Sequence, residues 1–291
     1  MIYSIRWRCR KLRLAYTIAF AIVIVAGLGN WQIQRSFAST LIYFHGGGTH
    51  LQRGLYNFDT DTGVSTLRAT VGGTAERFDA MTSRPADGVV FAVSPRLSTN
   101  GTDLYTINVN NGAFTHLAEL SFTSDYIVNI AFNPFSGTLY GLQRNGPGLF
   151  TIDQVTGQCT QVATKEFARA GFDFAPDGRL FGTGTNPDNS LYQINAATGA
   201  ETGFGHITGS DLLEDAAFTL NGEMFVTEFR SGDIFRYDTA TGTRTIVGTT
   251  DPGVTGIIAV PVPESSTLAL MACGLATCAL YLASRRPNQR P

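Results

Sequence analysis

The stretch GLYNFDTDTG, at residues 54–63, decides the fold, because it recurs along this 291-residue chain. Further copies read DLYTINVNNG at 103–112, GLFTIDQVTG at 148–157, SLYQINAATG at 190–199 and DIFRYDTATG at 233–242. Each copy is an aromatic-containing strand followed by a polar turn that ends in glycine. The closing glycines lie 49, 45, 42 and 43 residues apart, which suits four short strands and their turns. The middle of the chain is therefore predicted to be a β-sheet repeat protein.

The order of strands around these copies predicts how the repeats close. Each copy continues with a Thr/Val-rich strand, a longer loop and an apolar strand, and in four of the five a further apolar strand follows. The fifth copy stops at Val260, while an orphan strand of the missing type begins at Thr40. A ring of sheets has no open edge if one blade takes a strand from each end of the chain. We predict an all-β, five-bladed β-propeller over residues 39–261, in which Leu41 to Phe44 complete the blade built from Asp233 to Val260.

Charge is distributed unevenly and limits the possible partners. Nine of the 21 basic residues lie before residue 39 or after residue 264, where no acid occurs, so 12 basic residues face all 23 acidic ones in between. The middle therefore carries a net charge of about −11. Phosphate binding needs clustered cations, so a nucleic-acid partner is excluded.

The first 38 residues read as a secretory signal peptide. A basic leader precedes the apolar run Leu14 to Gly29, and Ser36 and Ala38 place small residues at the −3 and −1 positions of a cleavage site. The alternative is an uncleaved membrane anchor, for which a run of 16 residues is slightly short. We expect cleavage after Ala38 and export across the inner membrane.

The last 30 residues, 262–291, have the order of a sorting tail. A second apolar run, 268–283, is predicted to form a transmembrane helix and is followed by Arg285 and Arg286. Because basic flanks stay cytoplasmic, both chain ends are expected inside and the middle outside the inner membrane. A simple C-terminal membrane anchor is the alternative.

This tail resembles the PEP-CTERM sorting signal of Gram-negative bacteria, in which a Val-Pro-Glu-Pro-Ser-like motif precedes a short transmembrane helix and a basic end. Val262, Pro263 and Glu264 match the motif, whereas Ser265 stands in the place of its second proline. The resemblance implies an exosortase-type membrane protease as partner, contact with the inner membrane during sorting, and a cell-surface or extracellular location. It is also typical of organisms that make exopolysaccharide.

The repeats resemble bacterial propellers with LYxID…TG units, such as the NHL, TolB-like and lactonase-type propellers. This motif is a fold signature, and one fold hosts binding, scaffolding and hydrolysis. The resemblance to lactonase-type propellers implies calcium held by acids and amides near the axis. By that resemblance the axial candidates are Asp79, Asn129, Asp173 and Asp215. Glu214 lies beside the last of them.

These axial candidates do not share one position in the repeat. Asn129 and Asp215 each stand three residues before the residue that ends their apolar strand. Asp79 stands two residues before the end of its strand, and Asp173 stands one residue before. A metal ring would need more regular offsets, so we expect them to solvate the axis or bond strand ends rather than catalyse. No catalytic, cofactor-binding or metal residue is assigned.

Other polar residues are expected to be structural. The four histidines lack metal-ligand spacing, and His45 and His50 are expected to be exposed loop residues. Asp59 and Asp61 imitate a calcium loop, but the bidentate Glu at its twelfth position is missing, which favours an ordinary turn. Cys159, the lone cysteine outside the two tails, is expected to be a small buried or half-buried side chain.

The sequence therefore predicts an exported propeller that acts as a binding or structural module without a cofactor, with a polysaccharide or other matrix component as partner. The alternative is a calcium-assisted, lactonase-like hydrolase that uses the axial acids.

Overall fold

A computed structural model describes residues 40–46, 51–72, 77–96, 101–121, 125–144, 146, 148–164, 169–184, 190–204 and 212–260. These residues form 20 strands in five four-stranded sheets. The predicted signal peptide and sorting tail lie outside the described residues. Within the described ranges, no helix long and apolar enough to cross a membrane occurs.

Each sheet is one blade of the propeller, with its strands ordered from the axis outward. Blade I contains β20 (Val254–Val260), β1 (Thr40–His45), β2 (Gly54–Asp59) and β3 (Ser65–Thr70). Blade II contains β4 (Ala80–Ser83), β5 (Val90–Arg96), β6 (Gly101–Ile107) and β7 (Phe114–Glu119). Blade III contains β8 (Ile127–Phe132), β9 (Leu139–Gln143), β10 (Gly148–Ile152) and β11 (Cys159–Thr164). Blade IV contains β12 (Arg169–Phe174), β13 (Leu180–Gly184), β14 (Leu191–Ile194) and β15 (Glu201–Phe204). Blade V contains β16 (Leu213–Phe218), β17 (Met224–Glu228), β18 (Asp233–Tyr237) and β19 (Arg244–Thr249).

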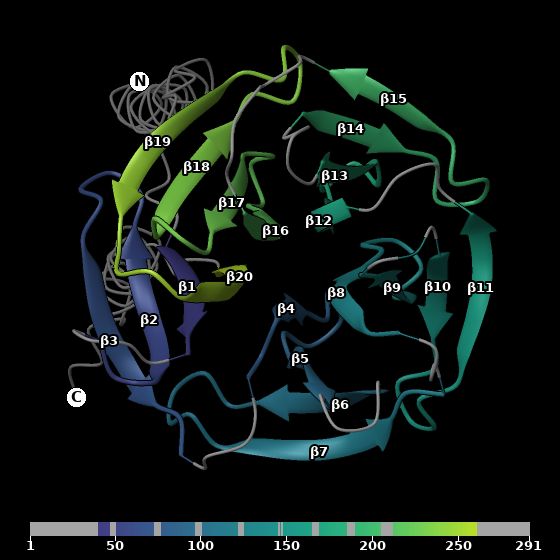
Figure 1. The fold of residues 1–291 in the computed structure, drawn as a ribbon, viewed down its shortest axis with the longest axis horizontal. Helices are drawn as coiled ribbons and strands as arrows, with labels where there is room; N and C mark the ends of the chain where they lie inside the picture. The colour runs from purple at the N-terminus through teal and green to yellow at the C-terminus, as the bar shows by residue number, and fades with distance from the viewer. Residues whose placement is uncertain are drawn as a thin grey trace, which may run out of the picture. The chain divides into compact units, whose positions relative to one another are not determined.

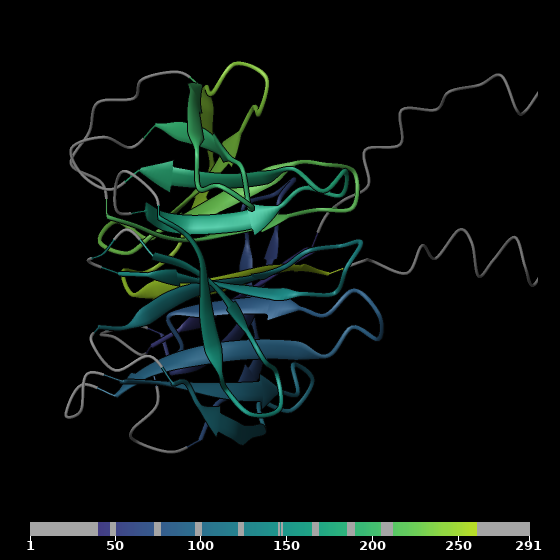
Figure 2. The same ribbon diagram turned by 90° about the vertical axis from the view of Figure 1, so that its right-hand side faces the viewer.

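The five blades stand around a common axis (Figure 1). The innermost strands contact one another in the closed order β20, β4, β8, β12, β16 and again β20. Tight turns join the first strand to the second in blades II to V, and the third to the fourth in all five blades, at the end of the ring that we call the turn end. The other ends of the strands lie at the opposite end of the ring, which we call the loop end (Figure 2). Thr40 pairs with Val260 at the turn end, so the described chain begins and ends there.

The closure pairs the predicted strands but divides the blades differently from the prediction. The N-terminal strand β1 pairs with β20 on one side and with β2 on the other. The prediction that Leu41 to Phe44 complete the blade built from Asp233 to Val260 was wrong for β18 and β19, which are the outer strands of blade V. The reason is that one sequence repeat spans two blades: its aromatic and Thr/Val-rich strands end one sheet, and its apolar strands start the next.

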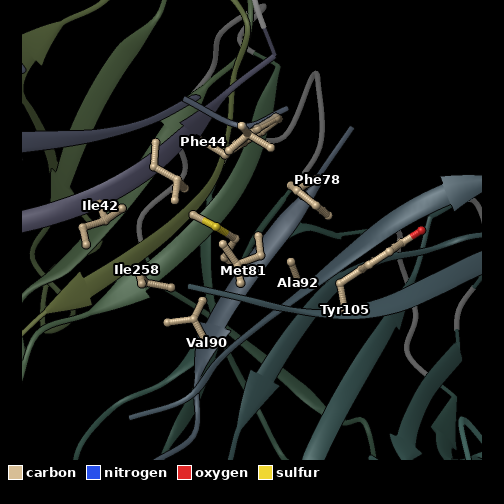
Figure 3. Packing of buried hydrophobic residues seen from close by; sticks show 11 residues of the cluster. Ile42, Phe44, Phe78, Met81, Val90, Ala92, Tyr105 and Ile258 are labelled. Atoms are coloured by element: carbon tan, nitrogen blue, oxygen red, sulfur yellow. The ribbon is translucent and has the colours of Figure 1, made fainter. Parts of the chain in front are cut away.

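Hydrophobic cores fill all five junctions between blades. At the junction of blades I and II, Ile42 and Phe44 of β1 pack with Phe78, Met81 and residues of the next blade (Figure 3). The intervening residues of β1, Leu41 and Tyr43, point to the other face of the sheet and pack against blade V. Because side chains alternate along a strand, this strand contributes to two junctions. The closing strand is therefore fully integrated into the ring.

The glycine that ends each repeat has a second role besides its turn. These five glycines have φ between 68° and 73°, the left-handed region that side chains disfavour. At Gly199 a Cβ atom would lie 2.7 Å from the carbonyl oxygen of Thr164, on the outer strand of the preceding blade. Gly63 approaches the Val247 carbonyl oxygen in the same way across the closing junction. At Gly63, Gly112, Gly157 and Gly199 the recurrent glycine thus lets its hairpin pack against the neighbouring blade.

We expect Gly199→Ala to destabilise the ring more than Gly137→Ala. Both residues have positive φ, at 71° and 66°. An alanine in this conformation costs about 1–2 kcal/mol, and this cost is the same at both positions. Nothing lies within 4 Å of a Cβ at Gly137, whereas Gly199 faces the Thr164 backbone. The clash should add about 1–3 kcal/mol. Urea unfolding of both variants measures the difference, and equal losses of stability would show that the close approach carries no energy.

The sequence also predicted the surroundings of three polar or thiol side chains outside the axis. His45 is not an exposed loop residue: it ends β1, is wholly buried, and its Nε2 lies 2.9 Å from the Pro252 carbonyl oxygen. The prediction was wrong because β1 continues to the residue before the glycine run. Asp59 is a turn residue as predicted, since its Oδ1 accepts hydrogen bonds from the amides of Asp61 and Thr62. Cys159 is half-buried and is not in a disulfide.

Candidate functional site on the axis of the ring

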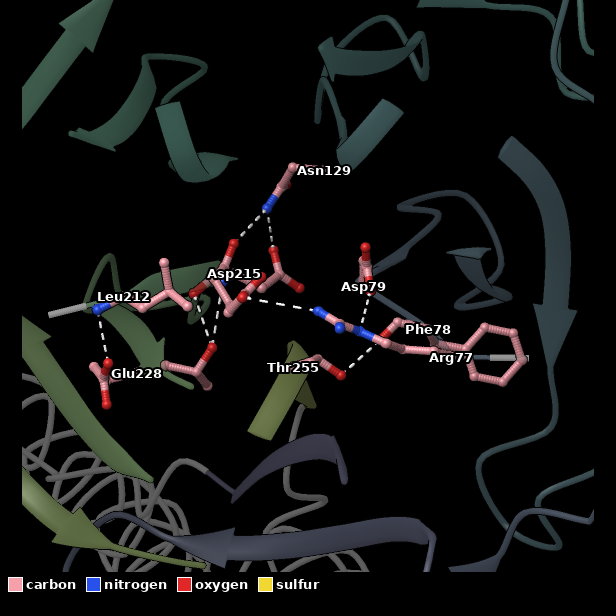
Figure 4. A network of polar contacts seen from close by, with 10 residues as sticks. Arg77, Phe78, Asp79, Asn129, Leu212, Asp215, Glu228 and Thr255 are labelled. Atoms are coloured by element: carbon pink, nitrogen blue, oxygen red, sulfur yellow. Dashed lines mark hydrogen bonds and ion pairs between the residues drawn. The ribbon is translucent and has the colours of Figure 1, made fainter. Parts of the chain in front are cut away.

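The middle of the axis is occupied by the carboxylate of Asp215, which links four blades. Its Oδ2 accepts hydrogen bonds from the amides of Met81, at 3.1 Å, and Ile257, at 2.8 Å. Its Oδ1 accepts from the Asn129 side-chain amide, at 2.7 Å, and from the Ala216 amide, at 2.8 Å. The side chain is wholly buried, and burial raises its pKa well above the usual value, while these four donors act in the opposite direction. This carboxylate is therefore a polar link between innermost strands (Figure 4).

A β-bulge explains how β16 turns Asp215 toward the axis. The pairing of β16 with β17 shifts between Leu213 and Ala216, so one residue more lies on β16 than on its partner. Bulges leave backbone groups without ladder partners and redirect side chains. Thr227 compensates, because its Oγ1 lies 3.3 Å from the amide of Asp215 and 3.4 Å from the carbonyl oxygen of Asp215. Thr183 makes the same pair of contacts to Gly171 at the matching bulge of blade IV.

Toward the loop end, an arginine lies between two acids. The Arg77 Nε is 2.7 Å from Asp79 Oδ1, and its Nη2 is 3.9 Å from Glu214 Oε1. Burial raises the pKa of Asp79, and the charges of Arg77 and Arg144 oppose that shift. Burial, with the charge of Asp79 added, raises the pKa of Glu214 to about 7. These charges partly compensate one another, so this cluster reads as an ion-pair network.

Toward the turn end, the axis opens into a pocket of about 330 Å³. Its walls are mostly apolar, and among the described residues that line it Asp173 of β12 is the one titratable side chain. The Asp173 Oδ1 accepts a hydrogen bond from the amide of Phe174, at 2.8 Å, and Oδ2 from that of Phe218, at 2.7 Å. Burial among apolar neighbours raises its pKa to about 7. Within the described residues, no cationic side chain pairs with Asp173. An apolar pocket with one such acid is the usual form of a small-molecule site.

The structure thus places the four axial candidates at three levels. Asn129 and Asp215, the two that share an offset in the repeat, contact each other directly. Asp79 lies two residues before Met81, toward the loop end. Asp173 accepts a hydrogen bond from the amide of Phe218, which stands three residues after Asp215 on β16. Three residues span about 10 Å along a strand, so Asp173 lies about that far from the level of Asp215. They do not form one ring.

This arrangement does not fit the predicted calcium alternative. Calcium takes six to eight oxygen ligands, whereas the surroundings of Asp215 are N–H donors, which repel a cation. Across the described part of the chain, no three His, Cys, Asp or Glu side chains gather closely enough to hold a metal ion. Asp173, about 10 Å from the level of Asp215, could supply only one carboxylate to a separate site.

Sequence reasoning missed several residues that position the axial groups. Thr255 donates to the Phe78 carbonyl oxygen at 2.6 Å and so joins blade I to the segment before β4. Glu228 Oε1 accepts from the Leu212 amide at 2.7 Å, which anchors the start of β16. Thr183 and Thr227 were detectable, because both stand two residues after the phenylalanine of RLFGTG and EMFVTE. Thr255 and Glu228 have no such repeated pattern.

Together the ring and its axis define an all-β, five-bladed propeller with a polar link at its middle and an apolar pocket at its turn end. A family described as a repeat of unknown function, DUF6923, matches residues 129–258, which is less than half of the chain. No curated protein matches.

One of the solved structures that this chain resembles has a TM-score above 0.5 and supports the fold. A chain in the crystal structure of a nidogen/laminin complex matches with a TM-score of 0.51 and 9% identity, over 76% of this chain and 98% of that one. TolB from Acinetobacter baumannii matches with a TM-score of 0.47 and 16% identity, over 75% of this chain and 54% of that one. Virginiamycin B lyase from Staphylococcus aureus matches with a TM-score of 0.42 and 13% identity, over 69% of each chain. At these identities the comparison concerns architecture alone, and function has to be argued from the site.

Proposed function

We propose that this protein is an exported β-propeller that acts as a binding module at the cell surface or outside the cell. The observation that carries the binding role is the turn-end pocket, which combines apolar walls with one acid that no cation neutralises within the described structure. Asp173 bonds to a neighbouring strand through the Phe218 amide, as Asp215 does with its neighbours, but unlike Asp215 it is only partly buried and lines a pocket. The partner is a small molecule or a chemical group carried by a polysaccharide or other matrix component.

The hydrolase alternative has less support. Hydrolysis assisted by calcium would need several oxygen ligands free to turn toward one ion, and the Asp215 carboxylate is committed to four N–H donors instead. A binding screen separates the alternatives. Residues 39–262, which include all 20 described strands, are exposed to glycan arrays and to a library of small organic molecules. Binding that a chelator leaves unchanged supports the module, and calcium-dependent turnover of a lactone would overturn it.

The export and sorting part of the proposal rests on the two tails. We expect the mature protein to begin at Ser39 and to lose its C-terminal apolar run in a strain that contains an exosortase-type protease. Mass spectrometry of both ends, in strains with and without that protease, measures this. Glu264→Ala should leave the tail uncut, and Glu223→Ala, which changes a half-buried acid in the ring, is the matched control. A tail that stays intact in both strains would contradict sorting and favour a simple anchor.

A further inference from the structure

We infer that the turn-end pocket binds a ligand that carries a protonated amine on an apolar body, with Asp173 as the partner of the ammonium group. This inference rests on the proposed binding function and names the chemistry of its ligand. Three features support it: the walls of the pocket, the state of its acid and the charge of the surrounding domain.

The walls of the pocket can hold an apolar body and attract a cation. Phe132, Phe174 and Phe218 line it, and Met81 and Ile257 close it from two other blades. Each phenylalanine is held by a second aromatic ring, which is Phe91, Tyr140 or Phe181, with centroids 5.2–5.5 Å apart. Rings that are fixed in this way form a preorganised surface, and their faces favour cations.

Within the described residues, the acid in the pocket has no positive partner. Each oxygen of Asp173 accepts one backbone N–H, at 2.8 and 2.7 Å, which leaves each with a further lone pair. These donors are neutral, and no basic side chain is among the described residues that line the pocket. An ammonium group would supply the missing charge and donate to both oxygens. A neutral or anionic ligand could not, and an anion would be repelled.

The rest of the domain favours the same class of ligand. Between the two tails the chain carries a net charge of about −11, which raises the local concentration of cations around it. At the rim of the pocket the side chains of Phe135 and Leu220 are 76% and 78% exposed. Two large apolar side chains left in water at the mouth fit a ligand whose body, and not only its charge, is apolar.

The test compares three probes of one size with residues 39–262 by isothermal titration calorimetry. The probes are 2-phenylethylamine, the neutral 2-phenylethanol and the anionic phenylacetate. A charge-assisted hydrogen bond contributes about 1.5–3 kcal/mol, so the amine should bind about 10- to 100-fold more tightly than the alcohol. Phenylacetate should not bind. Asp173→Asn should reduce the preference for the amine to about twofold or less, and Asp177→Asn, an exposed acid on the next turn, should preserve it.

The pH dependence provides a readout that a change in shape alone would not produce. The pKa of Asp173 is raised to about 7, so the acid is mainly neutral at pH 5.5 and mainly ionised at pH 8.5. 2-Phenylethylamine stays protonated over this range. Its affinity should therefore rise about 10-fold from pH 5.5 to pH 8.5 in the wild type, and stay constant in Asp173→Asn.

The outcomes separate this inference from the proposed function. Equal affinity for the amine and the alcohol, or an amine preference that survives Asp173→Asn, would overturn the ammonium assignment and leave the pocket as a binding site. Failure of all three probes, in a protein whose unfolding shows it to be folded, would overturn the assignment. Failure of the broader glycan and small-molecule screen as well would overturn the binding function.

Discussion

Replacing Asp215 by alanine is expected to lower the free energy of unfolding by about 3–5 kcal/mol, a large effect for one substitution, because it breaks a buried hydrogen-bond network. The variant would leave the amides of Met81, Ile257 and Ala216, and the side chain of Asn129, without their shared acceptor. Each unsatisfied buried donor costs about 1–3 kcal/mol, while relief from burying the acid returns part of that sum. Because these donors belong to four of the five blades, the loss affects most of the ring. Urea unfolding followed by circular dichroism measures it.

Two further variants make this result specific. Asp61→Ala removes an exposed acid that joins the Asp59 turn through its backbone amide, and should change stability by less than about 0.5 kcal/mol. Asp215→Asn keeps one acceptor oxygen but turns an NH₂ group toward backbone donors, so an intermediate loss is expected. An Asp215→Ala protein as stable as the wild type would mean that the four donors find other acceptors, and the link would then not hold the ring.

The fold could be predicted from the sequence because its determinants are local and repeated. An aromatic strand, an Asx-capped turn and a glycine recur five times, and five weak signals at a regular spacing amount to one strong one. Asp59, Asn108, Asp153, Asn195 and Asp238 each accept hydrogen bonds from amides two or three residues on. The pairing of the first strand with the last also followed from counting strands, since only that pairing leaves no open edge.

The blade boundaries and the axial site depend on relations that a repeat does not encode. A sequence repeat has no natural starting point, so the register between repeat and blade stayed open, and β18 and β19 were placed with the wrong neighbour. The axial acids were identifiable as a group, but their depth along the axis depends on bulges at Leu213 to Ala216 and at Arg169 to Phe172. The pocket at Asp173 arises from five blades at once and has no contiguous pattern in the sequence.

Ending the chain before the last strand should abolish the folded ring. A protein of residues 39–251 lacks β20, the innermost strand of blade I, and with it the buried side chains of Val254, Ile257 and Ile258. Burying each of these side chains contributes about 1.5–3 kcal/mol, and the amide of Ile257 also donates to Asp215. This loss is comparable to the whole stability of a domain of ordinary size, which is about 5–15 kcal/mol.

The matched control ends the chain after Val260 and so keeps β20 and its pairing of Thr40 with Val260. We expect this protein to unfold cooperatively and the shorter one to show no cooperative transition by near-ultraviolet circular dichroism. Without β20, the inner edge of β1 would expose unpaired backbone groups, so the shorter protein should also aggregate, which size-exclusion chromatography detects. If the 39–251 protein unfolded with the same midpoint as the control, the remaining four blades and three strands would be sufficient. The ring would then not depend on closure through its first and last strands.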